Sequence, residues 1–589
     1  MTRQVPVAGA RGQEDGVRSW RDHVVFLALG LVAALVATWP VWLDPAGRLP
    51  GREHPGVLTH VWKFWWTAEA VLDQHTNPAW THMLHHPRGL EVGYYLASFL
   101  DGLWTLPITQ LAGPIASYNV FVVLSTATGA WAAMRLAAWL GLARGPSVFV
   151  GLAWGLCPYH VGFLYGGAIE NLAAPWIPLA VLAILHLMER PRDETSPRRR
   201  ALVAVGLAAC LFLEGLATWY GGLLLACGGG ALVALLYALR GRSAQVGALW
   251  ATAGLLVGGV AVLLAARVLL PTPEPLCSLA ETIPTSRTFP PPLAKDLRVT
   301  WLLLALAGAA TRRGRFWLLL ALPFVADMIA APVVARHVPN TVESDASVAS
   351  LAVDLVLLDS RRRSLPVHLL LSLSAGHGLA WLVGVARSRG WRRAAGILPL
   401  LAIGLWTWEA QGYQGQSHLP TPAFELEPRP HAQFLAEAEP GAVLDLPLLV
   451  IQETGSANRS KALRSRFLFD QTVHGRPVLT AVGTRLSYDL CALPLPDPLV
   501  EVLHARALGS PRPLPERWDP AAMRRNGYGW VVFHPGLQDP RADRRLERDL
   551  GAVLGAPRTF PDGVEVFRVP DGPVDVAPAP VQSETPPTG

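Results

Sequence analysis

The residues best suited to chemistry gather between residues 44 and 117. This segment holds the carboxylates Asp44, Glu53, Glu69, Asp73, Glu91 and Asp101, and the basic residues Arg48, Arg52, His54, His60, Lys63, His75, His82, His85, His86 and Arg88. Carboxylates and imidazoles transfer protons, and cationic side chains bind anions such as phosphates. Trp62, Trp65 and Trp66 lie among them, and such rings settle at headgroup depth, whereas ionised groups are costly in hydrocarbon. A loop that lies on a membrane is therefore predicted.

Three of these histidines, His82, His85 and His86, have a spacing that would suit a metal ion bound on a helix. Pro87 follows them at once, however, and no carboxylate completes a ligand set, so we expect surface histidines and no metal site. The chain also lacks a phosphate-binding glycine loop, a Cys-x-x-Cys pair and a Gly-x-Ser-x-Gly turn. The sequence therefore predicts no bound cofactor.

The composition places these residues in a polytopic α-helical membrane protein. Of 589 residues, 51% are hydrophobic and 16% are charged, which is too apolar for a soluble globule. The formal net charge of +6 comes largely from arginine clusters in short loops. It therefore describes orientation in the membrane and gives no sign of nucleic-acid binding.

About eleven spans are expected in a bundle that covers residues 23–410, after a cytoplasmic leader over residues 1–22. No convincing cleavage site follows the first span, so it is predicted to be an uncleaved anchor. The expected spans are His23–Leu43, Asn119–Leu142, Pro146–Gly166, Ile169–Met188, Ala201–Thr218, Tyr220–Leu239, Gln245–Leu270, Leu297–Ala310, Phe316–Ala335, Pro366–Ala386 and Gly396–Glu409.

The distribution of arginine sets the orientation of these spans. Nearly all basic loops fall on the cytoplasmic side if Leu96–Ala112 is left out of the count, and only Arg361–Arg363 are placed outside. Because Leu96–Ala112 carries Asp101 and Pro107, it is predicted to be a helix along the outer face. The first outer loop then covers residues 44–117, and the chain after about Glu409 is also extracytoplasmic.

The C-terminal part, residues 411–570, is predicted to be an extracytoplasmic α/β domain, because strand and helix patterns alternate in it. Gly441–Val450, Asn526–His534 and Gly563–Val569 have strand patterns, whereas Pro520–Arg525 and Arg541–Leu554 have helical ones. The proline-rich residues 571–589 are expected to form a disordered tail.

This plan resembles the GT-C superfamily of membrane glycosyltransferases, and more narrowly the bacterial membrane proteins related to protein mannosyltransferases and to the YfhO-like proteins. The shared plan is an anchor, a long first outer loop with a membrane-lying helix, a many-span bundle and an outer α/β domain. The similar stretches are His60-Val61-Trp62, Trp65-Trp66, Ser117-Tyr118-Asn119, Pro158-Tyr159-His160, Ala217-Thr218-Trp219-Tyr220-Gly221 and Asn526–His534.

The resemblance implies transfer of a hexose or pentose from a polyprenyl-phosphate carrier to an acceptor on the outer face of a bacterial cytoplasmic membrane, among membrane lipids. It also implies a catalytic carboxylate early in the first outer loop. Such a carboxylate would take the acceptor's proton, while the lipid phosphate leaves as a stable anion. Glu53 is in about this place, and Glu170 is the second candidate. The residues expected to bind the substrate are Arg52, His54, His60, Lys63 and Arg88.

Two alternatives stay open. Relatives often have a Gly-Asp pair where this chain has Pro55-Gly56, so either Glu53 serves as the base or the chain is a GT-C-like bundle without catalysis. Glu214 and Asp327 lie inside expected spans, where acids pair helices or carry a proton or cation. They keep a transporter or flippase as a further alternative.

Overall fold

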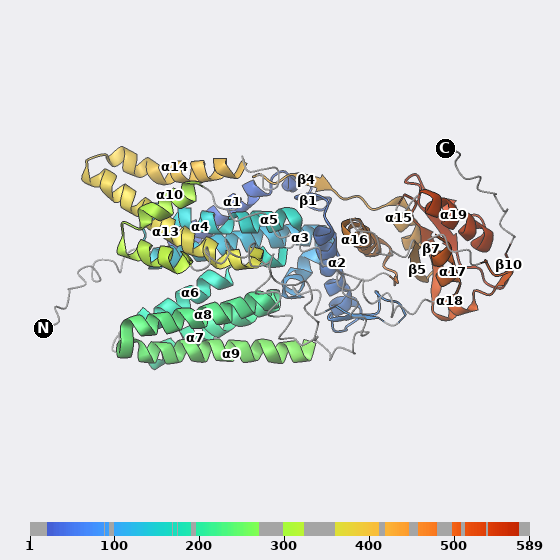
Figure 1. The fold of residues 1–589 in the computed structure, drawn as a ribbon, viewed down its shortest axis with the longest axis horizontal. Coiled ribbons are helices and arrows are strands. Elements are labelled where there is room, and N and C mark those ends of the chain that lie inside the picture. The colour runs from blue at the N-terminus through green and yellow to red at the C-terminus, as the bar shows by residue number, and fades with distance from the viewer. Residues whose placement is uncertain are drawn as a thin grey trace, which may run out of the picture. The chain divides into compact units, whose positions relative to one another are not determined.

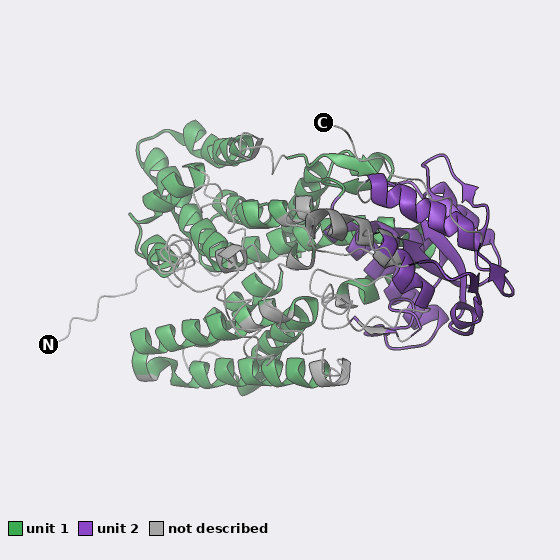
Figure 2. Ribbon diagram, turned by 45° about the vertical axis from the view of Figure 1, so that its right-hand side comes forward, with its two compact units in different colours: residues 1–53, 97–269, 280–425 green, residues 54–96, 270–279, 426–589 purple. Residues whose placement is uncertain are grey.

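The computed structural model describes residues 20–87, 89–92, 99–167, 169–172, 175–189, 196–269, 299–322, 360–411, 419–446, 457–479, 498–507, 513–536 and 540–576. The chain divides into two compact units (Figure 2). Unit 1 combines residues 1–53, 97–269 and 280–425, and unit 2 combines residues 54–96, 270–279 and 426–589. The boundary at Glu53 divides the segment that the sequence predicts as the first outer loop.

Unit 1 is built mainly of helices (Figure 1). These are α1 (Trp20–Ala37), α3 (Phe99–Trp139), α4 (Arg144–Gly155), α5 (Pro158–Gly166), α6 (Trp176–Glu189), α7 (Pro197–Ala217), α8 (Trp219–Arg240), α9 (Gln245–Leu269), α10 (Val299–Gly308), a helix over residues 312–322, α13 (Ser360–Ser388) and α14 (Arg392–Gln411). Short turns η1 (Val41–Leu43), η3 (Ile169–Leu172) and η4 (Gly241–Ala244) join them.

Within the described ranges, five helices are long and apolar enough to cross a membrane, by length and composition. They cover Trp20–Ala37, Asp101–Trp139, Pro197–Ala217, Gln245–Ala265 and Pro366–Ser388. Trp176–Met188, Leu224–Arg240 and Val299–Gly308 are shorter apolar helices. The prediction of a mostly helical protein with several apolar helices is confirmed, whereas the count of about eleven spans stays a prediction, since residues 323–335 lie outside the described residues.

Large apolar side chains cover parts of the outer surface of unit 1. Leu256 and Leu263 on α9 are 65% and 68% exposed, and Leu400 and Trp408 on α14 are 67% and 69% exposed. A water-soluble protein rarely exposes contiguous apolar surface of this kind, but hydrocarbon accepts it at no cost. The exposure pattern therefore agrees with helices that face lipid.

Helix α3 changes direction sharply at Gly113, whose φ is 84° and ψ is 172°. The side-chain oxygens of Thr109 and Ser117 lie 2.7 Å apart. Eight residues of straight α-helix would separate them by about 12 Å along the axis. Residues 99–112 therefore form a helix distinct from the one that continues through Asn119, as the sequence predicts for this stretch.

Two predicted spans are interrupted. The expected span Pro146–Gly166 is divided into α4 and α5 because Pro158, which lacks an N–H and favours the first position of a helix, begins a new helix. The His160 Nδ1 lies 2.9 Å from the Trp154 carbonyl oxygen and donates to it at the end of α4. The expected span Ile169–Met188 is likewise divided into η3 and α6, with Pro175 in the turn just before α6.

The pair α10 and α13 is packed closely enough that Gly378 cannot carry a side chain. A Cβ built on Gly378 would lie 1.9 Å from the Leu304 carbonyl oxygen and 2.7 Å from the Gly308 nitrogen. The Ser374 hydroxyl donates to the Ala305 carbonyl across the same contact, at 3.1 Å. Small residues thus let two apolar helices approach closely, as in helix pairs within membranes.

We expect Gly378→Ala to destabilise unit 1, because overpacking a close contact typically costs about 1–3 kcal/mol. Thermal unfolding of the full chain in detergent measures the effect. Gly384→Ala is the matched control on the same helix, since nothing lies within 4 Å of a Cβ built at Gly384. A midpoint for Gly378→Ala equal to that of the control would show that the contact tolerates a methyl group.

Unit 2 contains a four-stranded sheet with the order β5-β7-β9-β8. Its strands are β5 (Ala442–Leu446), β7 (Tyr528–Phe533), β8 (Arg558–Thr559) and β9 (Glu565–Arg568). Strands β5 and β7 are parallel, with Leu446 opposite Phe533, whereas β7–β9 and β8–β9 are antiparallel. The three predicted strands are therefore present, and residues 447–450 of the first lie outside the described residues.

The helices of unit 2 are α15 (Pro430–Glu437), α16 (Ala457–His474), α17 (Pro498–Ala507), α18 (Ala521–Arg525) and α19 (Pro540–Leu554). Leu546, Leu550 and Val553 of α19 are buried, and they form a core with Leu503 of α17 and Val531 of the sheet. Strand β10 (Val574–Asp575) pairs with β6 (Arg517–Trp518). The fold therefore extends beyond Asp571, where the sequence predicts that the tail begins.

Residues 54–96 of the predicted first loop belong to unit 2, whereas residues 97–117 belong to unit 1. The part in unit 2 forms α2 (Pro55–Ala68), η2 (Glu69–Asp73), β2 (Trp80–Thr81) and β3 (Leu90–Glu91). The buried Trp62 indole donates from Nε1 to Gln471 Oε1 of α16 at 2.7 Å, and Gln471 Nε2 donates to the Met83 carbonyl at 2.7 Å. One side chain of α16 therefore holds two parts of the loop, which are 409 and 388 residues away in sequence.

Candidate active site

The first residues of the outer loop are fixed to unit 1 by a short antiparallel strand pair. Strand β1 (Arg48–Pro50) pairs with β4 (Ala423–Glu425), so that Leu49 lies opposite Phe424. The Gly51 N–H donates to the Pro422 carbonyl at 2.6 Å, and the Arg48 guanidinium forms an ion pair with Glu425 at 2.5 Å. The chain is thus fixed as far as Gly51, which is two residues before Glu53.

A buried asparagine of α3 also fixes this loop. The Asn119 Nδ2 donates two hydrogen bonds of 2.8 Å each, to the carbonyl oxygens of Pro45 and Arg48. Asn119 is 1% exposed. In the sequence, Asn119 belongs to the Ser117-Tyr118-Asn119 stretch and begins the expected span Asn119–Leu142, and neither pattern shows which backbone groups its amide will reach.

Glu53 and Arg52 are exposed and follow this anchored segment directly. Glu53 is the last residue of the first segment of unit 1, and His54 is the first residue of unit 2. The arrangement places a carboxylate and a guanidinium side by side in sequence, on the solvent-accessible end of a fixed loop. A carboxylate that is accessible to solvent can accept a proton from a hydroxyl group brought to it.

The other predicted substrate-binding residues in the loop make internal contacts. The His54 side chain caps α2, because its Nδ1 accepts from the Gly56 N–H at 3.1 Å. His60 and Lys63 are only 5% and 8% exposed, and Lys63 Nζ lies 3.2 Å from His60 Nε2. The structure therefore places His54, His60 and Lys63 within the packing of unit 2, while Arg52 is exposed.

The remaining predicted residues are placed only in part. Arg88 and Asp327 lie outside the described residues, and Glu170 lies in η3, where only its backbone is described. Glu214 is 3% exposed at the end of α7 and accepts from the Thr218 hydroxyl at 3.3 Å. The close approach of Gly221 of α8 to the Glu214 carboxylate leaves no room for a Cβ, which is consistent with a packed helix pair.

The histidines at 82–86 do not form a ligand set. His86 Nε2 donates to the Asn526 carbonyl at 2.6 Å, and the Tyr528 hydroxyl donates to the His86 carbonyl at 2.6 Å. His86 therefore ties the loop to the strand β7 region of unit 2. In the part of the chain that the structure describes, no group of three His, Cys, Asp or Glu side chains could hold a metal ion.

Sequence analysis missed a buried cluster of ionisable side chains in unit 2. At the carboxyl ends of the parallel strands, His534 Nε2 lies 2.9 Å from Asp445 Oδ1. On the neighbouring helices, the Arg429 guanidinium donates to both oxygens of Asp470, and His431 Nε2 lies 3.6 Å from Asp470 Oδ2. The rings of His431 and His534 are 5.4 Å apart. These residues come from segments that are far apart in sequence, so no spacing pattern predicts the cluster.

Burial sets the protonation states in this cluster. It lowers the pKa of His474 to about 4, and it lowers the pKa of His534 although Asp445 favours the charged ring. Burial alone would raise the pKa of Asp470, but the Arg429 guanidinium and His431 hold that pKa well below its usual range. His474 and His534 are therefore neutral at pH 7, and Asp470 is ionised.

We expect acid to destabilise unit 2. An unfolded histidine has a pKa near 6.5, above the folded value of about 4 for His474, so the unfolded chain binds more protons between these values. The free energy of unfolding that depends on neutral His474 is therefore fully present above about pH 6.5. It falls by at most about 3 kcal/mol as the pH is lowered toward 4. Hydrogen exchange of the full chain in detergent, followed from pH 7 to 4.5, measures this loss.

His474→Asn is the matched variant for this measurement. The His474 Nδ1 accepts from the Arg476 N–H at 3.0 Å, and an asparagine oxygen keeps an acceptor but does not titrate. The variant should lose less stability than the wild type over the same pH range. Equal pH dependence in the two proteins would contradict the assignment to His474.

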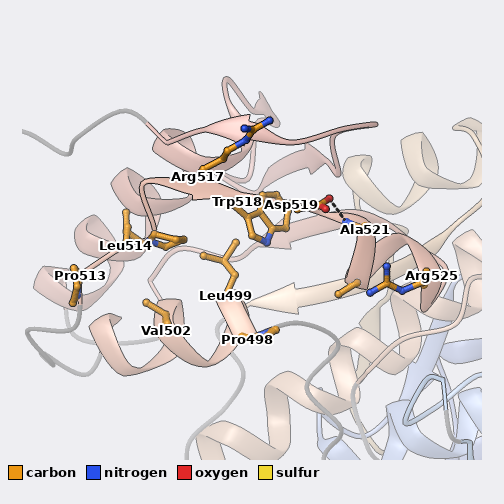
Figure 3. A pocket seen from close by; sticks show the side chains of 12 residues that line it. Pro498, Leu499, Val502, Pro513, Leu514, Arg517, Trp518, Asp519, Ala521 and Arg525 are labelled. Carbon is orange, nitrogen blue, oxygen red and sulfur yellow. Dashed lines mark hydrogen bonds between the residues drawn. The ribbon is translucent and has the colours of Figure 1, made fainter.

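A pocket of about 530 Å³ lies elsewhere in unit 2 (Figure 3). Trp518 and Leu499 line it together with Arg517, Arg525 and Asp519, and the Asp519 carboxylate accepts from the Ala521 N–H at 2.9 Å. None of the residues that the sequence analysis proposes for catalysis or substrate binding lines this pocket. The exposed Arg52 and Glu53 therefore remain the best-placed pair among the predicted residues.

Among comparisons with known proteins, only the comparison with solved structures finds similar proteins. No protein-family profile and no curated protein sequence matches the chain. The solved structure of arabinofuranosyltransferase AftD from Mycobacteria is similar over 94% of this chain, with a TM-score of 0.54 and 19% identity. This chain covers 42% of the AftD chain, which is less than half of that protein.

Two further solved structures are similar at lower TM-scores. The Archaeoglobus fulgidus oligosaccharyltransferase has a TM-score of 0.48 and 9% identity, over 87% of this chain and 69% of that one. ArnT from Cupriavidus metallidurans, solved with undecaprenyl phosphate, has a TM-score of 0.44 and 15% identity, over 93% of this chain and 98% of that one. The likeness to AftD, which runs through nearly the whole chain, shows that this protein shares the fold of that part of the arabinofuranosyltransferase.

Proposed function

We propose that this protein is a membrane glycosyltransferase that moves a sugar from a polyprenyl-phosphate carrier to an acceptor at the outer face of a bacterial cytoplasmic membrane. The observation that carries the proposal is the fold likeness to an arabinofuranosyltransferase over 94% of the chain. The anchored loop that leads to Arg52 and Glu53 supports it, because the resemblance to the GT-C superfamily implies a catalytic carboxylate early in the first outer loop. A fold alone hosts many activities, so the proposal rests on both observations.

The proposed reaction is a displacement at the anomeric carbon of the donor sugar. The acceptor hydroxyl oxygen forms the new bond to that carbon, and the bond between the carbon and the lipid phosphate oxygen breaks. Glu53 accepts the hydroxyl proton as general base, and the lipid phosphate leaves as an anion that needs no proton. The guanidinium of Arg52 stabilises the negative charge on the departing phosphate. Glu170 is the alternative base, at the outer side of the bundle in the proposed orientation.

Substitution of Glu53 tests the assignment of the base. Glu53→Gln should lower the transfer rate by about 10²- to 10⁴-fold, the usual contribution of a general base, because the amide cannot accept the proton. The rate is measured in proteoliposomes with a panel of radiolabelled polyprenyl-phosphate pentoses and hexoses.

Glu425→Gln is the matched control, since Glu425 is an exposed carboxylate on the strand that pairs with β1. It should keep the wild-type rate within about 2-fold, because an exposed ion pair contributes little. Full activity of Glu53→Gln would exclude Glu53 as the base. If the wild type and both variants are folded but none transfers a sugar, the result would support the alternative that the chain is a bundle without catalysis.

The proposed sidedness has its own test. If the chain after α14 is extracytoplasmic, a phosphatase fused after Gln411 should be active in intact cells, because the enzyme folds only outside the cytoplasm. A fusion at Arg242, in a basic loop expected to be cytoplasmic, is the control and should be inactive. The reverse result would place the loop and the C-terminal unit in the cytoplasm and remove the outer-face reaction.

A further inference from the structure

We infer that Asn119 is a positioning residue for Glu53, an inference that rests on the proposed function. Its first support is the hydrogen-bond geometry described above. Both N–H groups of the side-chain amide are used, one for the Pro45 carbonyl and one for the Arg48 carbonyl. These carbonyls lie 74 and 71 residues away in sequence, on the loop that leads to Glu53. A single side chain of the helical bundle therefore holds two backbone carbonyls of that loop.

The segment held by Asn119 is a tight turn. The Arg48 N–H donates to the Asp44 carbonyl at 2.9 Å, and the Gly47 N–H donates to Asp44 Oδ1 at 3.1 Å. The N–H groups of Gly47 and Arg48 donate within the turn. The carbonyls of Pro45 and Arg48 accept from a donor outside the turn. Asn119 is the side chain that supplies both donors at the buried side of the turn.

The orientation of the Asn119 amide follows from these two contacts. A rotated amide would place its oxygen against two carbonyl oxygens, which repel it. The Oδ1 atom therefore points away from the loop, and among the described residues no donor lies within hydrogen-bond distance of it. The Asn119 side chain is thus held by the two hydrogen bonds that its Nδ2 donates, and its Oδ1 takes no part in them. Only a side chain with two N–H groups at this distance can take its place.

The position of Asn119 is itself fixed by the turn in α3. Asn119 lies two residues after Ser117, whose hydroxyl contacts Thr109 across the bend at Gly113. Strand β4 and Pro422 also hold the loop by backbone contacts. Two independent sets of hydrogen bonds therefore hold residues 45–51, and Glu53 follows two residues after Gly51. If the amide is removed, one of the two sets is lost, and the carboxylate has freedom to move.

Movement of a general base by about 1 Å can cost about 10²-fold in rate, because proton transfer requires a fixed geometry. Asn119→Ala should therefore lower kcat by about 10- to 100-fold and leave the KM for the donor within about 2-fold. Asn119→Asp is isosteric but puts a carboxylate oxygen against the two carbonyls, so it should lower kcat at least as much. Asn119→Gln keeps the donors at a greater reach and should be less affected than either.

A double-mutant cycle separates positioning from a general structural role. In the Glu53→Gln protein the base is already absent, so adding Asn119→Ala should change the residual rate by less than about 2-fold. A structural role would lower the rate by the same factor in both backgrounds. Additive losses, or a rise in donor KM with kcat unchanged, would overturn the inference.

Hydrogen exchange of the full chain gives a readout that does not depend on activity. Asn119→Ala should speed the exchange of the Gly47 and Arg48 amides and leave α7 and α9 unchanged. Thr421→Val is the matched control, because it removes a buried hydroxyl that donates to the Ala37 carbonyl at 3.0 Å while the Thr421 N–H keeps its own bond to that carbonyl. Its kcat should stay near the wild-type value.

These outcomes distinguish the failure of the inference from the failure of the proposed function. Wild-type protein without transfer activity, or full activity in Glu53→Gln, removes the proposed base, and the inference fails with it. A large loss in Glu53→Gln together with additive rates or unchanged exchange in Asn119→Ala overturns only the role of Asn119.

Discussion

A loop at the end of an apolar helical bundle must find hydrogen-bond partners for its backbone, because neither hydrocarbon nor apolar side chains can supply them. In unit 1 two devices meet this requirement, the amide of Asn119 and the short β1–β4 pair. Both act on residues 45–51, and the exposed Arg52 and Glu53 follow directly. The place of Arg52 and Glu53 in the molecule follows from this constraint.

Unit 2 buries a network of ionisable side chains that serve as partners for one another. The sheet buries apolar residues such as Val531 against α17 and α19, whereas Asp445 and His534 meet the helices α15 and α16. Removing one partner of a buried ion pair such as Arg429 and Asp470 leaves an uncompensated charge, so such a cluster is stable only when every member is present. The cluster accounts for much of the polar content of this core.

Helix α16 has a further role, since its Gln471 joins α2 and the loop around Met83 to the same unit. Burial of His60 and Lys63 in this packing makes them contributors to the fold of the unit. Among the predicted site residues whose side chains are described, the exposed candidates for chemistry are Arg52 and Glu53, at the end of the first segment of unit 1. A fold by itself does not decide activity, since chemistry depends on particular side chains and their geometry.

The amino-acid sequence by itself determined the elements that depend on local pattern. Apolar runs of sufficient length identified the helical bundle, and period-two or period-3.6 patterns identified Tyr528–Phe533 and Pro540–Leu554 to within two residues. Pro107 and Asp101 separated the helix before Gly113 from the span after it. The positions of Glu53 and Arg52 came from resemblance, and the sequence alone did not establish their exposure.

Only the tertiary structure decided which distant residues meet. The breaks at Pro158 and Pro175 were visible as prolines, but their effect depended on partners such as the Trp154 carbonyl. The contact of Asn119 with Pro45, the pairing of β1 with β4, and the cluster around Asp470 join segments that lie tens to hundreds of residues apart. Sequence patterns report local periodicity and hydrophobicity, whereas these contacts arise when the whole chain packs and each buried polar group must find a partner.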